Sequence, residues 1–344
     1  MKIILDAMGG DHAPRAIVQG ALMAQKELGV EVLLAGRVED ILEILKQEGI
    51  NELPKGFEIA HAPDVIAMEE NPTASIKEKP ESSIMVALRA LADGQGEALV
   101  SAGSTGALLT AATFVVKRIK GVRRAALSPL VPTAQGPALL IDCGANTECT
   151  AEYLLQFGFM GAYYMQRVQN IQNPRVGLLN IGTEETKGPP SHKEAYQLLA
   201  QAHTQGALNF VGNLEGRDIA FGGADVIVAD GFSGNIFLKT LEGVGLYFAD
   251  TLKGILMKNV KSKLAAALIR RDMTGFKKML DYTEYGGAPL LGLQKPVIKA
   301  HGASNPRAVC SAVRQAVSFA QGQVPQALAA QIDSMRAGSG EAEQ

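Results

Sequence analysis

The chain has 344 residues and a formal net charge of −2, and it combines 47% hydrophobic with 20% charged residues, as soluble globular enzymes do. This charge balance, without a basic stripe that carries aromatic residues, predicts that nucleic acid is not a partner. The five histidines and three cysteines follow no CxxC or HExxH spacing, so we expect neither a metal site nor a disulfide framework.

The start of the chain does not have the pattern of a secretory signal, because the apolar run in "MKIIL" meets Asp6 and a glycine pair at once. No apolar run approaches the roughly 20 residues that a membrane-spanning helix requires. We therefore expect a cytoplasmic protein.

Short apolar segments alternate with amphipathic ones through most of the chain. The apolar segments lack a clean polar alternation, which is typical of strands covered on both faces. They are "KIIL", "VEVLLAG", "FEIAHAP", "EALVSAG", "PALLIDCGAN", "RVGLLNIG", "LNFVGNLEG", "ADVIVADG" and "PVIKAHG". The amphipathic segments between them, such as "PRAIVQGALMAQKEL" and "EDILEILKQ", predict helices. This alternation predicts an α/β fold with a mainly parallel sheet.

Residues 235–282 interrupt the alternation with a purely helical pattern. Apolar residues recur there at three- and four-residue steps, at Phe237, Leu241, Val244, Phe248, Leu252 and Ile255. We predict a helical segment that projects from a single catalytic domain of residues 1–330. If that domain is divided into two lobes, residues 129–137 are the candidate crossing. The polar tail 333–344 is predicted to be disordered.

Polar loops that contain glycine follow most of the predicted strands. They are "DAMGGD" (6–11), "SAGSTGA" (101–107), "DCGAN" (142–146), "NIGTEETKG" (180–188), "GNLEGRD" (212–218), "DGFSGN" (230–235) and "HGAS" (301–304). Ligands of parallel sheets bind outside the carboxyl ends of the strands, so these loops predict one shared site.

The loop "SAGSTGA" has the clearest chemistry of the seven. Gly103 and Gly106 allow a ligand to approach the backbone, Ser104 and Thr105 supply hydroxyl donors, and a predicted helix follows directly. A helix N-terminus of this kind favours an anion such as phosphate. The alternative is a turn in which Ser104 only caps the helix. The loop matches neither the P-loop nor the GxGxxG pattern.

The remaining candidates are weaker when taken alone. "DGFSGN" repeats the same logic with Ser233 and Asn235, and helix capping is again the alternative. The charges around Lys187 also fit a solvated loop. His301 follows a predicted strand, which favours a site role, while Cys143 has no adjacent base and is predicted to be a buried, unreactive thiol.

Eight motifs taken together resemble the bacterial phosphate acyltransferase family, the PlsX proteins of phospholipid synthesis. In chain order they are "ILDAMGGDHAP", "SAGSTGA", "DCGAN", "NIGTEETKG", "NLEGRDI", "ADVIVADGFSGN", "DYTEYGGAPLLG" and "HGASNPRAV". The resemblance extends from residue 1 to about residue 320. It implies a Rossmann-like α/β/α sandwich, related to phosphate acetyltransferases and to isocitrate and isopropylmalate dehydrogenases, in a homodimer without a cofactor.

The same resemblance implies an activity. A fatty acyl group passes from the thioester of acyl carrier protein to inorganic phosphate, and a membrane acyltransferase uses the resulting acyl phosphate to acylate glycerol 3-phosphate. Phosphate is ionised near neutrality and the leaving thiol has a pKa of about 8.5, so positioning and fixed donors suffice for catalysis.

On this basis we predict two sets of site residues. The expected catalytic residues are His301, Lys187, Asn235 and Asn180. The expected substrate-binding residues are Asp6, Gly9, Gly10, Asp11, Ser101, Gly103, Ser104, Thr105, Gly106, Asp142, Asn146, Gly182, Asn213, Glu215, Asp230, Ser233 and Gly234. Asp6 and Asp11 are expected to orient donors, because a carboxylate repels an anion.

The basic end of the projecting segment predicts a second contact surface. Its residues are Lys258, Lys261, Lys263, Leu264, Leu268, Ile269, Arg270 and Arg271. This surface could contact anionic lipid at the inner face of the cell membrane, or it could bind the acidic acyl carrier protein. The third alternative is a solvated helical hairpin that serves only the dimer. Two rival functions stay open, a nicotinamide-dependent dehydrogenase and a non-catalytic lipid or carrier-protein adaptor.

Overall fold

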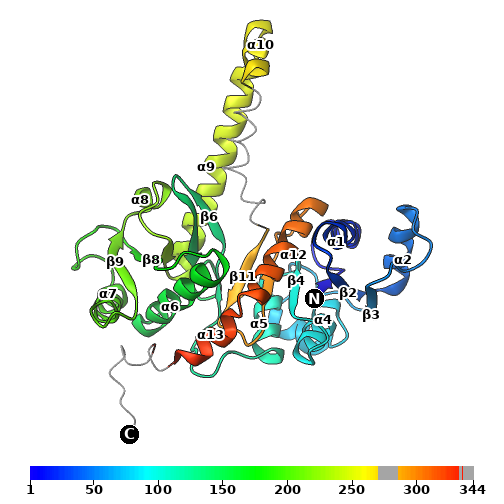
Figure 1. Ribbon diagram of the computed structural model, residues 1–344, viewed down its shortest axis with the longest axis horizontal. Helices are drawn as coiled ribbons and strands as arrows, with labels where there is room; N and C mark the ends of the chain where they lie inside the picture. The colour runs from blue at the N-terminus through cyan, green and yellow to red at the C-terminus, as the bar shows by residue number, and fades with distance from the viewer. Residues whose placement is uncertain (270–285, 333–334, 336–344) are drawn as a thin grey trace.

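The computed structural model describes residues 1–269, 286–332 and 335 of the chain. The predicted α/β architecture with mainly parallel strands is confirmed, but the strands form two sheets and not one. Figure 1 shows the two sheets in two halves that lie side by side, with a long helix rising away from them.

The first sheet has seven strands in the order β3-β2-β1-β4-β12-β11-β5. Their bounds are β1 Lys2–Asp6, β2 Glu31–Gly36, β3 Phe57–His61, β4 Ala98–Ser101, β5 Ala126–Leu127, β11 Ala288–Leu291 and β12 Val297–Lys299. β3, β2, β1, β4 and β12 are parallel, whereas β11 runs antiparallel to both β12 and β5. β5 therefore points in the same direction as β12.

The second sheet has five strands in the order β6-β7-β10-β8-β9. Their bounds are β6 Leu130–Thr133, β7 Gly136–Ile141, β8 Arg175–Leu179, β9 Asn209–Leu214 and β10 Val226–Val228. All of them are parallel except β6, which forms an antiparallel hairpin with β7. The chain passes from β5 of the first sheet to β6 of the second at residues 128–129.

Helices cover both faces of the sheets. Their bounds are α1 Arg15–Leu28, α2 Val38–Gln47, α3 Pro72–Glu78, α4 Ser83–Ala92, α5 Thr105–Val115, α6 Ala151–Val168, α7 Pro190–Thr204, α8 Gly216–Ala220, α9 Gly231–Met257, α10 Val260–Leu268, α12 Pro306–Gln321 and α13 Val324–Ala330.

The apolar core explains why the predicted strands lack polar alternation. Ile3 and Leu5 of β1 point into one cluster, while Ile4 points into a second cluster on the opposite face. The first cluster extends from β1 through α12 to α6 and the second sheet, as its members Val313 and Leu154 show. One continuous core therefore joins the two halves.

The long helix α9 is the element that leaves the body of the molecule (Figure 1). Its 27 residues span about 40 Å at the usual helical rise. Phe237 and Leu241 near its start pack against the second sheet, but Val244 and Ile255 farther along are 59% exposed. The prediction of a long helical segment is confirmed for α9 and α10.

Some predicted features lie outside the described residues. These are Arg270, Arg271 and the rest of the helical segment up to residue 282, and the tail 333–344 apart from Met335, which is buried. Within the described residues, no helix is long and apolar enough to cross a membrane.

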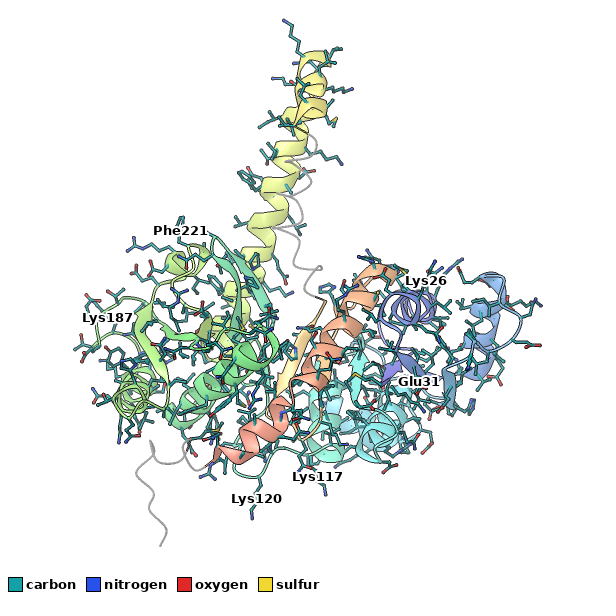
Figure 2. All side chains as sticks on the ribbon, in the orientation of Figure 1. Lys26, Glu31, Lys117, Lys120, Lys187 and Phe221 are labelled. Carbon is teal, nitrogen blue, oxygen red and sulfur yellow. The ribbon has the colours of Figure 1, made fainter. Side chains whose placement is uncertain are left out.

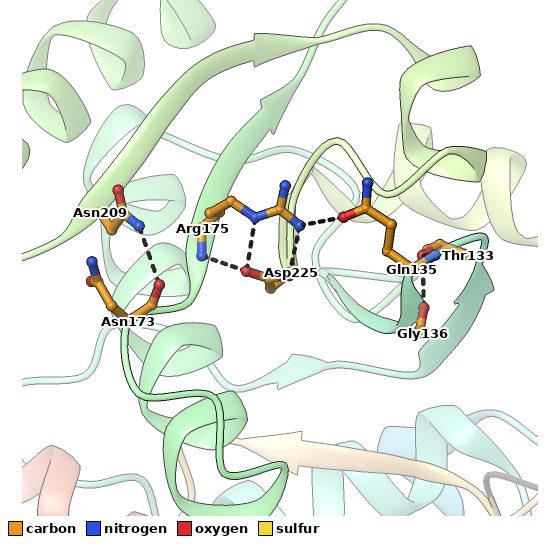
Figure 3. A network of polar contacts seen from close by, with 7 residues as sticks. All are labelled: Thr133, Gln135, Gly136, Asn173, Arg175, Asn209 and Asp225. Carbon is orange, nitrogen blue, oxygen red and sulfur yellow. Dashed lines mark hydrogen bonds and ion pairs between the residues drawn. The ribbon is translucent and has the colours of Figure 1, made fainter.

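A polar network fastens the amino ends of the strands in the second sheet (Figure 3). Arg175 at the start of β8 holds the Asp225 carboxylate with two side-chain hydrogen bonds of 3.1 and 2.9 Å. Burial opposes ionisation of Asp225, but these bonds to the guanidinium lower its pKa below the usual value. Arg175 also reaches Gln135 in the β6–β7 turn at 3.4 Å. The network lies at the edge opposite to the glycine-containing loops.

Candidate active site

The carboxyl edges of the two sheets touch each other. Leu127 ends β5, and its N–H donates a hydrogen bond of 2.9 Å to Oδ1 of Asp142, which directly follows β7. The N–H of Cys143 donates back to the Leu127 carbonyl, also at 2.9 Å. The glycine-containing loops of both sheets therefore lie along one continuous line of strand ends.

Asp142 is the centre of this junction. Its fully buried carboxylate accepts hydrogen bonds from the N–H groups of Cys143 at 2.7 Å and Asn146 at 2.6 Å, and from the Asn146 side chain at 3.1 Å. Burial raises the pKa of Asp142, and these N–H donors oppose that rise. The carboxylate therefore holds the shape of the "DCGAN" loop.

The loop "DGFSGN" at the start of α9 packs onto "DCGAN" without space for side chains. A Cβ atom at Gly234 would lie 2.0 Å from the Asp142 carbonyl oxygen, and one at Gly231 would lie 2.5 Å from that of Asn146. Glycine is required at both positions because the backbones meet directly. Asn235 lies beside Gly144: a Cβ atom added to Gly144 would be 3.7 Å from Cγ of Asn235.

Asp230 caps α9 and organises the polar side chains around it. Its carboxylate accepts from the Ser233 N–H at 2.8 Å and from the Ser233 hydroxyl at 2.9 Å. His192 places Nε2 3.6 Å from the same carboxylate. Ser233 thus uses its hydroxyl proton on Asp230, and the cap of α9 is Asp230 rather than Asn235.

The first sheet gathers a second group of loops. The Ser101 hydroxyl donates to Asp6 Oδ2 at 2.7 Å and accepts from the Gly103 N–H at 3.1 Å. A Cβ at Gly9 would lie 2.5 Å from the same Asp6 oxygen, so "DAMGGD" and "SAGSTGA" fit tightly together. The Asp11 N–H donates to the Gly302 carbonyl at 2.9 Å, which attaches the "HGAS" loop.

Ser104 is the N-cap of α5, and its hydroxyl oxygen accepts a long hydrogen bond of 3.5 Å from the Ala107 N–H. Capping is therefore one role of this residue. Thr105 and Gly106 begin the helix, and the first N–H groups of a helix have no partner within it. This end of α5 faces the same sheet edge as Asp6 and Ser101.

A third group lies farther from the junction, because β8 and β9 are the strands farthest from β7. The Asn180 side chain donates to the Lys187 carbonyl at 3.1 Å, and Asn213 donates to the Glu184 carbonyl at 2.9 Å. Gly182 packs against Lys187, while Glu215 caps α8. Figure 2 shows Lys187 on the outer side of this half. The predicted site residues thus form three groups, and Asp142 joins its own group to the end of β5 in the first sheet.

Two buried residues were not among the predicted site residues. Lys299 ends β12, is 7% exposed, and has a pKa lowered to about 8 by burial, with Asp6 and Asp11 opposing the shift and Lys239 of α9 adding to it. Burial also lowers the pKa of His192, and its neighbour Asp230 opposes that shift.

A pocket of about 320 Å³ lies away from these loops, at the amino ends of β8 and β9, and is lined by residues that include Phe159, Tyr163 and His203. Within the described residues, no group of His, Cys, Asp or Glu side chains is arranged to hold a metal ion. The polar loops at the carboxyl edges are therefore the candidate site.

A family model described as "Fatty acid synthesis protein" matches residues 1–327. The chain belongs to this family. Phosphate acyltransferase of Oceanobacillus iheyensis is 46% identical over 336 residues, which covers 97% of this chain and 98% of that protein. Phosphate acyltransferase of Acetivibrio thermocellus is 47% identical over 322 residues, which covers 93% of each chain. The family resemblance found in the sequence motifs is confirmed.

Two solved structures of phosphotransacetylases share the fold of this chain. A phosphotransacetylase from Streptococcus pyogenes superimposes with a TM-score of 0.62 at 16% identity, covering 95% of this chain and 94% of that one. The EutD phosphotransacetylase from Staphylococcus aureus gives a TM-score of 0.60 at 16% identity and the same coverage. At this level of identity the likeness establishes the fold alone.

Proposed function

We propose that this protein is an acyl-acyl carrier protein:phosphate acyltransferase. It transfers a fatty acyl group from the carrier-protein thioester to inorganic phosphate, and its acyl phosphate product feeds a membrane enzyme that acylates glycerol 3-phosphate. The observation that carries the proposal is the contact between Leu127 of β5 and Asp142 after β7, because the glycine-containing loops and the starts of α5 and α9 follow strand ends on that side of the two sheets. The name of the relatives, phosphate acyltransferase, supports the same reaction class.

The proposed reaction forms one bond and breaks one. A phosphate oxygen attacks the thioester carbonyl carbon, the carbonyl oxygen becomes an oxyanion, and the carbon–sulfur bond then breaks as the oxyanion collapses. The departing thiolate takes a proton from solvent. With a thiol pKa of about 8.5, the leaving group needs little acid assistance. Fixed donors aimed at the oxyanion supply the main catalytic effect, at roughly 3 kcal/mol for a single donor.

We assign phosphate binding to the start of α5. Ser104, Thr105 and the adjacent N–H groups provide donors at a helix N-terminus, where the helix dipole also favours an anion. The start of α9 with Asn235 faces the substrate from the second sheet. Asp6 acts through Ser101. Its carboxylate accepts a hydrogen bond from the Ser101 hydroxyl and so orients the "SAGSTGA" loop.

His301 and Lys187 are the proposed donors to the oxyanion. Nδ1 of His301 accepts a hydrogen bond of 3.2 Å from the Ala303 N–H, which assigns the proton of the neutral ring to Nε2. Lys187 belongs to the outer group and has a 46% exposed side chain. A loop position of this kind suits a residue that closes onto a large donor substrate.

The decisive experiment measures thiol release from acyl carrier protein with and without inorganic phosphate. We expect release that depends on phosphate and on the acyl chain. Release without phosphate dependence would contradict the proposal, and no release at all would favour the adaptor. A change in nicotinamide absorbance with a hydroxy acid substrate would favour the dehydrogenase instead.

We propose that the enzyme works as a homodimer through the outer part of α9. Val244, Leu246, Tyr247 and Phe248 expose 59%, 63%, 74% and 52% of their surface in the single chain. Val244, Tyr247 and Phe248 lie on one face of the helix, at three- and four-residue spacing, and an exposed apolar face of this kind marks an association surface. Analytical ultracentrifugation of Tyr247→Glu would give a monomer, whereas a dimer of unchanged stability would place the contact elsewhere.

We propose that the outer end of α9 and α10 contacts an anionic membrane. Lys258, Lys261 and Lys263 are exposed there, next to Leu264, Leu268 and Ile269, which are 63%, 88% and 41% exposed. Each basic residue near such a surface adds about 1 kcal/mol of attraction. Flotation with anionic vesicles tests this, with the three lysines changed to glutamate. Equal flotation of variant and wild type refutes it, and a selective loss of activity with carrier protein would assign the surface to that partner.

A further inference from the structure

Lys299 occupies an unusual position for a lysine, at the centre of the first sheet. It is the last residue of β12 and pairs in register with Ser101 of β4, which in turn donates to Asp6 of β1. The three polar residues thus end three neighbouring strands, and they are 7%, 1% and 2% exposed. Charged side chains are rarely buried to this degree unless they hold something in place.

The ammonium group of Lys299 binds the backbone of two predicted site loops. Its Nζ donates to the Ala102 carbonyl at 3.4 Å, at the entrance of "SAGSTGA", and to the Ala300 carbonyl directly before "HGAS". The Ala300 N–H donates to the Ser101 carbonyl at 2.8 Å, which closes the connection between the two strands. One side chain therefore fixes where both loops begin.

The charges around Lys299 come from three elements. Asp6 of β1 and Asp11 in the following loop favour its ammonium form, while Lys239 of α9 disfavours it. The Asp6 carboxylate is itself buried, and its Oδ1 has no hydrogen-bond partner among the described residues. With a pKa of about 8, most of Lys299 is in the ammonium form at pH 7, directly behind the "SAGSTGA" loop.

We propose that Lys299 is a positioning residue for phosphate binding, which turns the Ala102 and Ala300 carbonyls inward and leaves the N–H groups of residues 104–106 to face the anion. The inference rests on the proposed phosphate site at the start of α5. Carbonyl oxygens at strand ends would repel a phosphate dianion, and an ammonium group bound to them removes that repulsion. Lysine is suited to this task because its three donors reach carbonyls in different directions.

The test compares Lys299→Met and Lys299→Arg with wild type. Calorimetric titration with inorganic phosphate at pH 7 should show binding weakened at least about tenfold in K299M, the effect of losing one charge-assisted contact. In kinetics we expect the KM for phosphate to rise while the KM for the acyl donor stays within about twofold. Lys120→Met removes an exposed lysine from a distant loop (Figure 2) and should match wild type in every measurement.

The pH profile separates this role from a purely structural one. With a pKa of about 8, Lys299 loses about tenfold of its ammonium form between pH 7 and pH 9, and phosphate binding should weaken accordingly. The arginine of K299R keeps its charge over this range, so phosphate binding by K299R should not show this weakening with pH. K120M should show the same weakening as wild type. If K299M does not fold, the comparison of K299R with wild type decides alone.

Three outcomes are informative. The inference is overturned if K299M binds phosphate as tightly as wild type does. It is also overturned if phosphate binding by K299R weakens with rising pH as it does in wild type. Phosphate-dependent thiol release in wild type together with either of these results leaves the proposed function intact. Absence of phosphate-dependent release in wild type refutes the proposed function, and the calorimetric comparison then still decides whether Lys299 supports an anion site.

Discussion

Replacing Asp142 by Asn should weaken the "DCGAN" loop that this carboxylate holds in shape. Asparagine keeps one oxygen, which can accept from Leu127 and Cys143 as Oδ1 does now. Its NH2 group, however, replaces Oδ2, which accepts from the backbone and side chain of Asn146 at 2.6 and 3.1 Å. Two buried, charge-assisted hydrogen bonds at about 1.5–3 kcal/mol each are lost, so the free energy of unfolding should fall by about 3–6 kcal/mol.

Urea denaturation followed by circular dichroism measures this loss, with Glu152→Gln as the control. Glu152 forms a partly exposed ion pair of 2.8 Å with Arg123, and such surface pairs contribute only about 0–1 kcal/mol. We expect Asp142→Asn also to lower turnover, because both "DCGAN" and "DGFSGN" depend on this carboxylate. A loss of stability no larger than that of the control would refute the view that the Asp142 carboxylate holds the "DCGAN" loop in shape.

Three further changes test other parts of the site. Ser104→Ala combined with Thr105→Ala should raise the KM for phosphate at least about tenfold, and an unchanged KM in steady-state kinetics would exclude this loop as the phosphate site. Burial lowers the pKa of His192 in the folded state, so protonation opposes folding and stability should fall as pH drops below about 6.5. Thermal melts of His192→Gln should show a smaller fall in stability over this pH range. A pH profile identical to that of wild type would contradict this role of His192. Gly234→Ala places a Cβ 2.0 Å from the Asp142 carbonyl and should cost at least about 1–3 kcal/mol in urea denaturation, whereas a neutral effect would show that the two loops move apart easily.

The sequence was sufficient for most elements and for the loops between them. Buried parallel strands leave continuous apolar runs, and the loops at their carboxyl ends are marked by glycine, so β1, β4 and β10 and their loops were identified directly. β5, β6 and β11 were missed because they have two, four and four residues, and Pro132 and Pro289 interrupt the last two. Such short segments carry no periodicity from which a strand can be recognised.

The division into two sheets was not predictable from local pattern. β12 pairs with β4, although the whole second sheet and α9 lie between them in the chain. Lys299 was overlooked for the same reason, since a lysine after an apolar run normally marks the exposed end of a strand. Its Ala102 carbonyl partner and the Asp230 partner of His192 become neighbours only through tertiary pairing.

The first turn of α9, called its root here, and the far end of α9 have different neighbours but belong to one continuous helix. Asp230 and Asn235 at the root stand among the loops of the candidate site, while the other end is about 40 Å distant. The contact proposed for that end and the substrate binding proposed for the start of the helix would therefore be two spatially separate events. Shortening the helix by whole turns would alter the first and spare the second, so each can be measured without disturbing the other.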